Sequence, residues 1–530
     1  MTQTETQSDP LPDPDQMANA DVIYVRAEQK EDSTWTFDVT VSHPDTGWDD
    51  YADGWDVVLP DGSVVLIISG EPFTRLLTHP HVNEQPFTRS QSGIVIPDDV
   101  DYVIVRAHDI VDGYGGQEVI VRLDQANGLN FEVERPGLAR TSLNRGLTYQ
   151  QPDGNRYFSG LIDLASTEPV IVPLLDKPIW VVGTLAGESM EWLVAFEDGK
   201  MEVVTVTNGG IETTSLSATL SAGMPPSLVP SQSGGILNFQ ASDLAPFNHP
   251  ILTKESDLAY INGEGELIMQ SKGEIIQVDV NALPDGRILD DENGQLLVLS
   301  DPTREYDHAV LGDALEAGSV TLLNNSGEIL TKINAPDGQV FEAILPIWVD
   351  INEDGQREII LTASNAQQGA QIVVYDQSGN LLARSTPIGT GYRWRNQASV
   401  APFGPNGKIE LVNVITPHLL GKVEFLQMVD GRLERVAEIS GYTSHLIGTR
   451  NLDMFLSADL DADGKVELLL PSQDLTSLGL LQRTNNGAEV ITDLPLDGRL
   501  SSNLAGISLP DGSLAIAAGT DSGSLYLWLP

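Results

Sequence analysis

The stretch FLSADLDADGKVELLLP, residues 455–471, decides the fold of this chain. A short apolar segment leads into an acidic turn with a glycine at position 464, and a second apolar segment follows from Glu467. Short apolar runs separated by such a turn are typical of two antiparallel β-strands. The stretch therefore predicts a strand, a tight acidic loop and a second strand.

The same pattern recurs at intervals along the second part of the chain. Clear copies are IWVDINEDGQREIILTA (347–363), SVAPFGPNGKIELVNVI (399–415) and the weaker GISLPDGSLAIAAG (506–519). The aligned positions Glu358, Glu410, Glu467 and Ala515 are 52, 57 and 48 residues apart. Short strands repeated with a period near 50 are the signature of a β-propeller. Residues 151–530 are thus expected to form seven blades, with six or eight as the alternatives.

The last strand predicts how the ring closes. Leu525, Leu527 and Leu529 alternate with Ser524, Tyr526 and Trp528, which is the period of a strand. We expect this strand to lie in the closing blade, completed by a strand from about 155–172.

The region before the repeats predicts a small β-sandwich over residues 20–125. The segment 34–41 alternates polar and large apolar residues, and Asp61-Gly62 separates two β-branched runs, which is a strong hairpin signal. Residues 1–19 are polar and rich in Pro and Asp, so we expect a disordered leader there, and 126–150 is assigned to a linker. The fold class is therefore all-β, a sandwich followed by a propeller.

Composition narrows the classes of function. Acidic residues outnumber Lys and Arg by 76 to 29, and the net charge of −47 argues against nucleic acid and anionic membrane surfaces as partners. No apolar run approaches the roughly 18 residues of a membrane-spanning helix, so no membrane insertion is expected. The absence of cysteine rules out a disulfide scaffold and a thiolate metal site. We expect an extracellular, cell-surface or periplasmic protein, with the cytoplasm as the alternative.

Two of the turns have the acid spacing of calcium-binding loops. Oxygen-bearing side chains stand at positions 1, 3, 5 and 9, glycine stands at position 6, and position 7 would offer its backbone carbonyl. A set of oxygen donors without His or Cys favours Ca2+ over zinc or magnesium. Leu361 and Leu470 occupy the place of the twelfth-position Glu of an EF-hand, so these are not EF-hands. The predicted ligands of two calcium ions are Asp350, Asn352, Asp354, Gln356 and Glu358, and Asp459, Asp461, Asp463, Lys465 and Glu467.

The alternative is that Asp-Gly pairs only form hairpin turns. This is the prediction for the copy at 399–415, where Pro402, Gly404 and Asn406 replace the acids.

The acidic loops between strands, in repeats of this length, resemble the FG-GAP or VCBS repeats of integrin-alpha-like β-propellers. The resemblance covers about 340–530 well and 150–340 poorly. It implies ions in strand-connecting loops at the blade rim, ligand binding on a face of the propeller, and export. The final ligand of that family is commonly Asp, and Glu358 and Glu467 depart from this pattern.

A second constellation of candidate ligands lies in the sandwich. In an extended segment, residues i and i+2 face the same way, so His79 and His81 could chelate one zinc or copper ion. The alternative is that these histidines only form hydrogen bonds with their neighbours. The candidate ligands are His79, His81, Glu84, His43 and His108.

The run HPHVNEQPFTRS (79–90) carries a further resemblance. Together with PDTGWDDYADGWDV and VRAHDIVDGYGG it is similar to a small domain of exported bacterial proteins to which no activity is attached. The resemblance covers about 20–124. A purely structural role for these residues is equally consistent with the sequence. The motif residues include Asp45, Trp48, Tyr51, His79, His81, Glu84, Gln85, Phe87, Arg89, Tyr114 and Gly116.

A third set of residues could reach the centre of the propeller. Arg393 and Arg450 align just before innermost strands, and with nearby rings they could form a pocket for an anionic or sugar ligand. The alternative is that the arginines bridge blades through acids such as Asp453. The candidate residues are Arg393, Trp394, Arg450, His308 and His445.

These observations predict an exported calcium-binding propeller that acts as a binding, adhesion or scaffold module for a protein or glycan. No G-x-S-x-G, Walker or H-E-x-x-H motif is present, so no catalytic residue is assigned. The first alternative is a polysaccharide hydrolase or lyase with its site in the propeller funnel. It requires two carboxylates, or a His with an acid, converging on one face. The second alternative is a zinc- or copper-binding sandwich with the propeller as its carrier.

Overall fold

The computed structural model of this chain describes all residues except 1–18, 31, 68–69, 98–99, 124–126, 129, 136–151, 187–188, 208, 217–218, 227, 232–234, 239–240, 254–257 and 272–273. Apart from Asn19, the predicted leader therefore lies outside the described residues. Contacts divide the chain into two compact units. The first contains Met1–Leu143, Phe239–Leu244 and Met269–Ile275, and the second contains Asn144–Asn238, Ala245–Ile268 and Ile276–Pro530.

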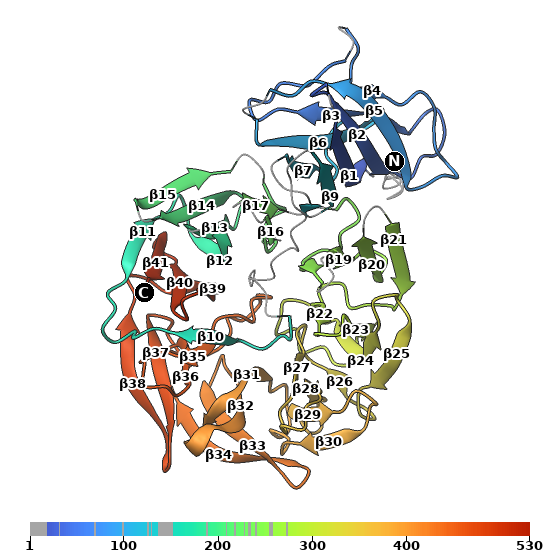
Figure 1. Cartoon of the computed structure of the whole chain (residues 1–530). Coiled ribbons are helices and arrows are strands. Elements are labelled where there is room, and N and C mark those ends of the chain that lie inside the picture. Colours follow the sequence, from blue (N-terminus) through green and yellow to red (C-terminus); the bar gives the residue numbers. More distant parts are fainter. Residues whose placement is uncertain are drawn as a thin grey trace, which may run out of the picture. The chain divides into compact units, whose positions relative to one another are not determined.

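The first unit contains two β-sheets (Figure 1). One sheet has the order β5-β2-β1-β9-β8 and the other has the order β4-β3-β6-β7. The strands of the first sheet are β1 (Asp21–Gln29), β2 (Trp35–Ser42), β5 (Phe87–Ile94), β8 (Asn127–Gly128) and β9 (Phe131–Glu134). Those of the second sheet are β3 (Ala52–Val58), β4 (Arg75–Leu76), β6 (Tyr102–Asp109) and β7 (Val119–Arg122).

The alternating pattern of the sequence produces the core of this sandwich. In β2, Phe37 and Val39 point to the buried face, and they belong to one apolar cluster with Trp55 of β3 and Val103 of β6. Residues of both sheets thus share one core, as in other β-sandwiches.

The range 126–150, assigned to a linker from the sequence, contains two strands. β9 pairs in parallel with β1, and Val25 lies opposite Phe131. The motif Phe-Glu-Val-Glu alternates in the same way as β2, so its apolar residues join the core of the first unit.

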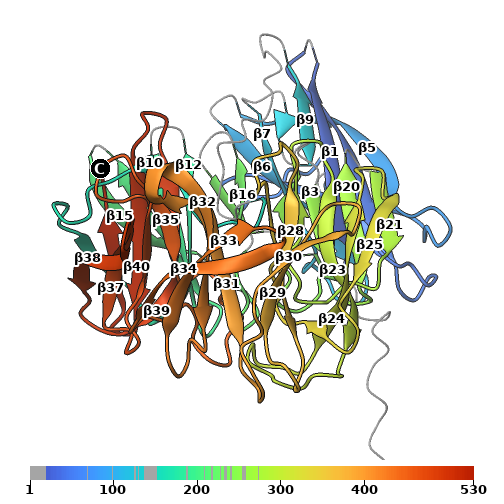
Figure 2. The same ribbon diagram turned by 90° about the horizontal axis from the view of Figure 1, so that it is seen from below.

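The second unit is a β-propeller. Its strands fall into seven groups of four in the described part of the chain, and Figure 1 shows these blades arranged around a centre. β10 (Tyr157–Leu161) adds a fifth strand to one blade, and three consecutive blades are linked into one 13-stranded sheet. Figure 2 shows neighbouring sheets standing side by side. The first three blades in chain order are β12 (Pro178–Ala186), β13 (Ser189–Phe196), β14 (Met201–Thr207) and β15 (Gly210–Ser215); β18 (Ile251–Leu252), β19 (Leu258–Ile261), β20 (Glu266–Ser271) and β21 (Glu274–Asp279); and β22 (Leu289–Asp290), β23 (Leu296–Thr303), β24 (Glu316–Leu323) and β25 (Ile329–Asn334). The fourth and fifth blades are β27 (Ile347–Val349), β28 (Glu358–Ser364), β29 (Gln371–Tyr375) and β30 (Leu381–Arg384); and β31 (Arg395–Gly404), β32 (Lys408–Ile415), β33 (Lys422–Val429) and β34 (Arg432–Ser440). The last two blades are β35 (Leu456–Asp459), β36 (Glu467–Pro471), β37 (Ser477–Thr484) and β38 (Gly487–Pro495); and β39 (Leu500–Ser508), β40 (Leu514–Thr520) and β41 (Ser524–Trp528) together with β11 (Val170–Pro173).

Short elements connect some of the blades. β26 (Val340–Phe341) pairs with both β24 and β28, and β30 has one parallel pairing with β34. A hairpin of β16 (Leu228–Ser231) and β17 (Gly235–Asn238) lies in sequence between the first two blades, and a 3-10 turn, Pro405–Gly407, connects β31 to β32.

The ring closes through a strand that precedes the first blade. β11 pairs antiparallel with β41, and Val170 lies opposite Leu527. The sequence places this strand at about 155–172, but the earlier part of that range forms β10 (Tyr157–Leu161), which pairs in parallel with β35. The first and last blades also share an apolar cluster that includes Trp192, Val194 and Leu525. Hydrogen bonds and apolar packing therefore both join the two ends of the ring.

Candidate functional site

The first acidic loop joins β27 to β28 and folds around the carboxylate of Asp350. The backbone N–H of Asp354 donates to Asp350 Oδ1 at 3.1 Å, and that of Gly355 donates to Oδ2 at 2.8 Å. Glu358, only 1 % exposed, accepts hydrogen bonds from a backbone N–H at 3.0 Å and from the Asn352 amide at 3.1 Å. The side chains at positions 1, 3 and 9 are thus held inside one short loop.

The second acidic loop joins β35 to β36 and gathers three carboxylates. Asp459, Asp461 and Asp463 each offer one oxygen, and these oxygens lie within 4.8 Å of one another. Gly464 N–H donates to Asp459 Oδ2 at 3.1 Å. The other oxygen of Asp459 is buried and has no hydrogen-bond partner among the described residues. This cluster of negative oxygens could hold a hard cation.

The two loops have the same backbone conformation. Position 4 has positive φ in both, 63° at Glu353 and 60° at Ala462, and the glycine at position 6 follows with 85° and 83°. Only glycine adopts such angles without a steric cost, which explains the glycine at position 6. Two separate sequences therefore build one loop geometry.

The residues at position 7, which are predicted to offer a backbone carbonyl, carry different side chains in the two loops. Gln356 donates from its side chain to a neighbouring backbone carbonyl at 3.1 Å. The Lys465 ammonium contacts Asp463, and this hydrogen bond holds the pKa of Asp463 below its usual value. The lysine therefore neutralises one of the three clustered aspartates.

The buried glutamates of both loops are difficult to ionise. Burial raises the pKa of Glu358 to about 7, and the charges of Asp354 and Asp350 act in the same direction. Burial likewise raises the pKa of Glu467 to about 7, although hydrogen bonds from Leu460 and Gln482 oppose the shift. Among the described residues, no Lys or Arg forms an ion pair with either glutamate.

In the copy of the repeat at 399–415, the buried glutamate has a positively charged partner. In register, Glu358 lies opposite Val349, Glu410 opposite Ala401 and Glu467 opposite Ala458, so the three glutamates are equivalent. Glu410 is also buried, but Arg483 of the next blade binds both of its oxygens, at 2.8 and 3.0 Å. Where the loop has lost its acids, an arginine thus supplies the positive charge.

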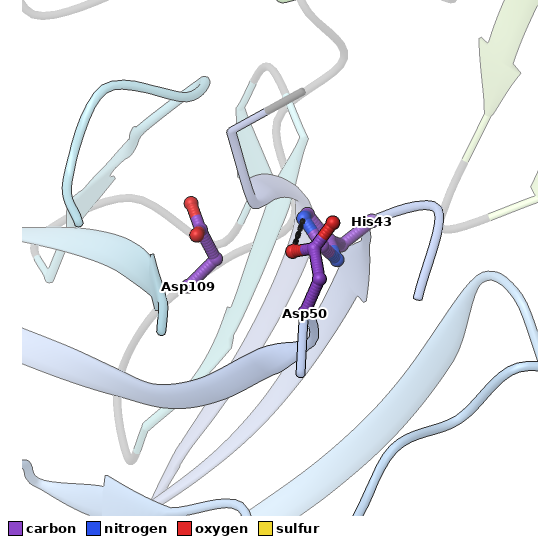
Figure 3. A group of neighbouring side chains, drawn as sticks. All are labelled: His43, Asp50 and Asp109. Carbon is purple, nitrogen blue, oxygen red and sulfur yellow. Dashed lines mark ion pairs between the residues drawn. The ribbon is translucent and has the colours of Figure 1, made fainter. Parts of the chain in front are cut away.

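In the first unit, a different cluster forms at one end of the sandwich. His43 follows β2, Asp50 precedes β3, and Asp109 ends β6. One ligand atom of each lies within 4.8 Å of the other two, and Figure 3 shows the three side chains. His43 Nε2 is 3.7 Å from Asp50 Oδ1.

Asp45 fixes the imidazole of this cluster. Its Oδ1 lies 2.7 Å from His43 Nδ1 and accepts the backbone N–H of Ala52 at 3.1 Å, while its Oδ2 accepts the N–H of His81 at 2.5 Å. Burial opposes a charge on His43, but Asp45 and the nearby carboxylates raise its pKa above the usual value.

The structure does not gather the five predicted transition-metal ligands into one site. The rings of His79 and His81 are 4.6 Å apart, but Glu84 forms an exposed ion pair with Arg89 at 2.9 Å. His108 Nδ1 contacts Asp53 at 2.6 Å, so it belongs to a separate pair. His43 instead joins Asp50 and Asp109, which the sequence reasoning missed.

The His79–His81 pair borders a cavity of about 280 Å3. Burial, followed by the charges of Arg89 and His79, lowers the pKa of His81. The ring nitrogens of His81 have no hydrogen-bond partner among the described residues. The other lining residues are Ile67, Glu71, Phe73, Thr74, Arg75, Leu76, Leu77, Thr78, Arg89 and Gln91.

The candidate residues at the centre of the propeller are divided between several contacts. Trp394 is buried and packs edge-on against His445 at 5.1 Å, and His445 Nδ1 lies 2.8 Å from His418 Nε2. Arg450 binds Asp285 at 2.6 Å and also contacts Asp313, and does not pair with Asp453. Arg393 is exposed.

His308 and Glu342 form a histidine–acid pair. The carboxylate contacts His308 Nδ1 but is fully buried at 0 % exposure, whereas the His308 side chain is 16 % exposed. Only the imidazole can reach a molecule outside the protein. The pair therefore orients one ring and does not present two reactive groups to a polymer.

Asp453, expected from the sequence to pair with Arg393 or Arg450, instead forms a buried charge network with two other arginines of the propeller. Asp453 Oδ2 lies 2.7 Å from Arg287 Nη1, and its Oδ1 lies 3.9 Å from Arg156 Nε. Burial would raise the pKa of Asp453, but the two guanidinium groups hold it below the usual value. The three residues of this charge network come from distant parts of the chain, so no local sequence pattern reveals the network.

Comparisons with known proteins identify no family. No protein-family model matches the chain. A protein of Halomicrobium mukohataei named "Putative lipoprotein" is 35 % identical over 120 residues, which cover 22 % of this chain. The match spans about half of that relative, 54 % of its length.

Two solved structures have distant similarity to the chain. A europium-containing methanol dehydrogenase matches 71 % of this chain and 91 % of its own, with 10 % identity and a TM-score of 0.46. A complex of BBS1N with ARL6DN matches 71 % of this chain and 97 % of its own, with 9 % identity and a TM-score of 0.37. At these scores neither likeness indicates what this chain binds. In the described part of the chain, no helix has the length and apolar character needed to cross a bilayer.

Proposed function

We propose that this chain is an exported calcium-binding β-propeller protein that acts as a binding, adhesion or scaffold module. One Ca2+ ion binds in each acidic loop, at Asp350, Asn352, Asp354 and Glu358 and at Asp459, Asp461, Asp463 and Glu467. A protein or glycan partner binds on a face of the ring. The ions hold the loops in shape and take no part in a reaction.

The contrast between the three equivalent glutamates carries this proposal. Glu410 lies in a loop without acids and is neutralised by Arg483. Glu358 and Glu467 are equally buried, lie beside other carboxylates, and have no basic partner among the described residues. A divalent cation would remove this repulsion and bring both glutamates back to their ionised form.

The donor set fits calcium. The first loop offers carboxylate oxygens and the Asn352 amide oxygen, the second offers carboxylate oxygens, and neither contains His or Cys. Their shared backbone geometry favours a shared ligand. When bound, Ca2+ would supply two positive charges and oxygen coordination that closes the loop. The second loop has one more carboxylate at its ligand positions than the first, but Lys465 neutralises one of them, so we expect the two sites to have similar affinities.

Further observations support two other parts of the proposal, which are ligand binding on a face of the propeller and export. The loops resemble those of FG-GAP or VCBS propellers, which supports ligand binding on a propeller face. The relative named as a lipoprotein supports export, and the net charge of −47 is best tolerated where salt screens it.

Calcium titration of the chelator-treated full chain tests the proposal. Calorimetry should detect about two Ca2+ ions per chain, and saturating Ca2+ should raise the melting temperature. At a Ca2+ concentration about 100 times Kd, each site adds about 2.7 kcal/mol to the free energy of unfolding.

Matched variants separate the loops from the rest of the ring. Glu358→Gln and Glu467→Gln should each remove one Ca2+ ion, whereas Glu410→Gln should lower the melting temperature and leave Ca2+ binding unchanged. If Ca2+ neither binds nor shifts the melting temperature of the unmodified chain, the proposal is wrong.

A further inference from the structure

The cluster at the end of the sandwich contains a carboxylate oxygen without a partner. Asp109 is 0 % exposed, and its Oδ1 accepts the backbone N–H groups of Val111 and Asp112 at 2.8 and 2.6 Å. Its Oδ2 is buried and has no hydrogen-bond partner among the described residues. An unsatisfied buried carboxylate oxygen is costly, so its presence beside His43 and Asp50 indicates a missing positive partner.

The imidazole beside it is oriented in the manner of a metal ligand. Asp45 accepts from His43 at Nδ1, which leaves Nε2 toward Asp50. A carboxylate on one ring nitrogen fixes the tautomer and makes the other nitrogen a better electron-pair donor. Asp45 is itself held by the backbone N–H groups of Ala52 and His81, so this orientation is rigid.

Charge balance leads to the same conclusion. Asp45, Asp50 and Asp109 lie around the His43 imidazole, and the His81 ring lies 3.8 Å from Asp45. None of the three carboxylates pairs with a Lys or Arg among the described residues. Even a protonated His43 would leave two negative charges in this largely buried cluster. A divalent cation bound by His43 Nε2, Asp50 and Asp109 would take the place of the proton on Nε2 and leave only one negative charge.

We propose that His43 Nε2, Asp50 and Asp109 bind one divalent first-row transition metal ion such as Zn2+. One imidazole with two carboxylates suits such an ion better than calcium, because calcium prefers oxygen donors alone. Three protein ligands leave a coordination position for water or for a ligand. The Asp50 side chain is 14 % exposed, which marks the side from which the ion would arrive. The site differs from the His79–His81 pair, and it does not depend on the calcium loops.

Zinc titration of the full chain tests this inference. The protein is stripped with chelator and saturated with Ca2+ to fill the propeller loops, and Zn2+ binding is then followed by calorimetry. We expect one Zn2+ ion per chain. Asp50→Asn and Asp109→Asn should each weaken its binding by at least about tenfold. His79→Gln and His108→Gln, which alter other histidines of the same unit, should leave it unchanged.

The Asp50 variant keeps the test decisive if the buried Asp109 variant does not fold. Its metal-free form should melt at the same temperature as the unmodified chain, so weaker Zn2+ binding would report a lost ligand. The double variant Glu358→Gln, Glu467→Gln should still bind Zn2+, which separates this site from the calcium proposal. The inference is overturned if no Zn2+ binds, if Asp50→Asn binds Zn2+ as tightly as before, or if His79→Gln abolishes binding.

Discussion

Replacing Asp453 by Asn should strongly destabilise the propeller. At an effective dielectric constant of about 20, the 2.7 Å contact with Arg287 corresponds to about 6 kcal/mol and the 3.9 Å approach of Arg156 to about 4 kcal/mol. The desolvation of three charges offsets much of this attraction. Removing one member of a buried ion pair typically costs about 3–5 kcal/mol, because it leaves the other charge uncompensated. Here two arginines, 2 % and 5 % exposed, would lose the only carboxylate that pairs with them among the described residues.

Differential scanning calorimetry of the full chain measures this effect. At about 2 °C per kcal/mol for a large domain, the propeller transition should fall by about 6–10 °C. Asp198→Asn is the matched control, because Asp198 forms an exposed ion pair with Lys200 at 2.5 Å and should leave the transition in place. If Asp453→Asn shifts the transition no more than Asp198→Asn, the network does not stabilise the ring and the reasoning is wrong.

Three further changes test the packing of the ring. Gly421→Ala would place a Cβ atom 2.3 Å from the Tyr442 carbonyl oxygen at a positive φ of 51°, so urea denaturation should show a loss of about 1–3 kcal/mol; an unchanged midpoint would contradict this geometry. Val172→Asp would put a charge into the apolar contact between the first and last blades, so limited proteolysis should cut the closing blade faster than in the unmodified chain; equal rates would argue against closure through β11. Burial lowers the pKa of His418 to about 4 and of His445 to about 3, while unfolded histidines titrate near 6.5. The unfolded state therefore binds more protons below pH 6.5, and stability should fall as pH drops toward 4, by about 1.4 kcal/mol per pH unit for each histidine. His445→Asn should flatten this pH dependence in urea denaturation at several pH values, and an equally steep profile would contradict the assignment.

The repeated blades could be predicted because their signals are local. Glu358 and Glu467 begin the second strand of a hairpin, Glu410 is the third residue of such a strand, and the acids or glycines just before them set the turn. The structure places all three in the same register, as their alignment in the sequence implies. Strand period and turn chemistry act within about 17 residues, so a single sequence reveals them.

Contacts between distant segments could not be predicted in this way. Arg483 reaches Glu410 from another blade, and nothing near either residue marks the pair. In the sandwich, the spacing of His79 and His81 drew attention to adjacent histidines. The cluster instead forms where the ends of different strands meet, bringing His43 to Asp50 and Asp109. The only local sign of this cluster in the sequence was the adjacent pair His108-Asp109. That pair does not show which residues Asp109 contacts in the folded chain.

The pairing of β11 with β41 has a consequence for how the protein is made. β11 leaves the ribosome before any complete blade, whereas its partner strand is synthesised only after six blades have been translated. During that interval β11 is an unpaired edge strand that could bind another nascent chain. Closure of the ring must therefore wait until β41 has been synthesised, and fast pairing of the two strands would protect this protein from aggregation.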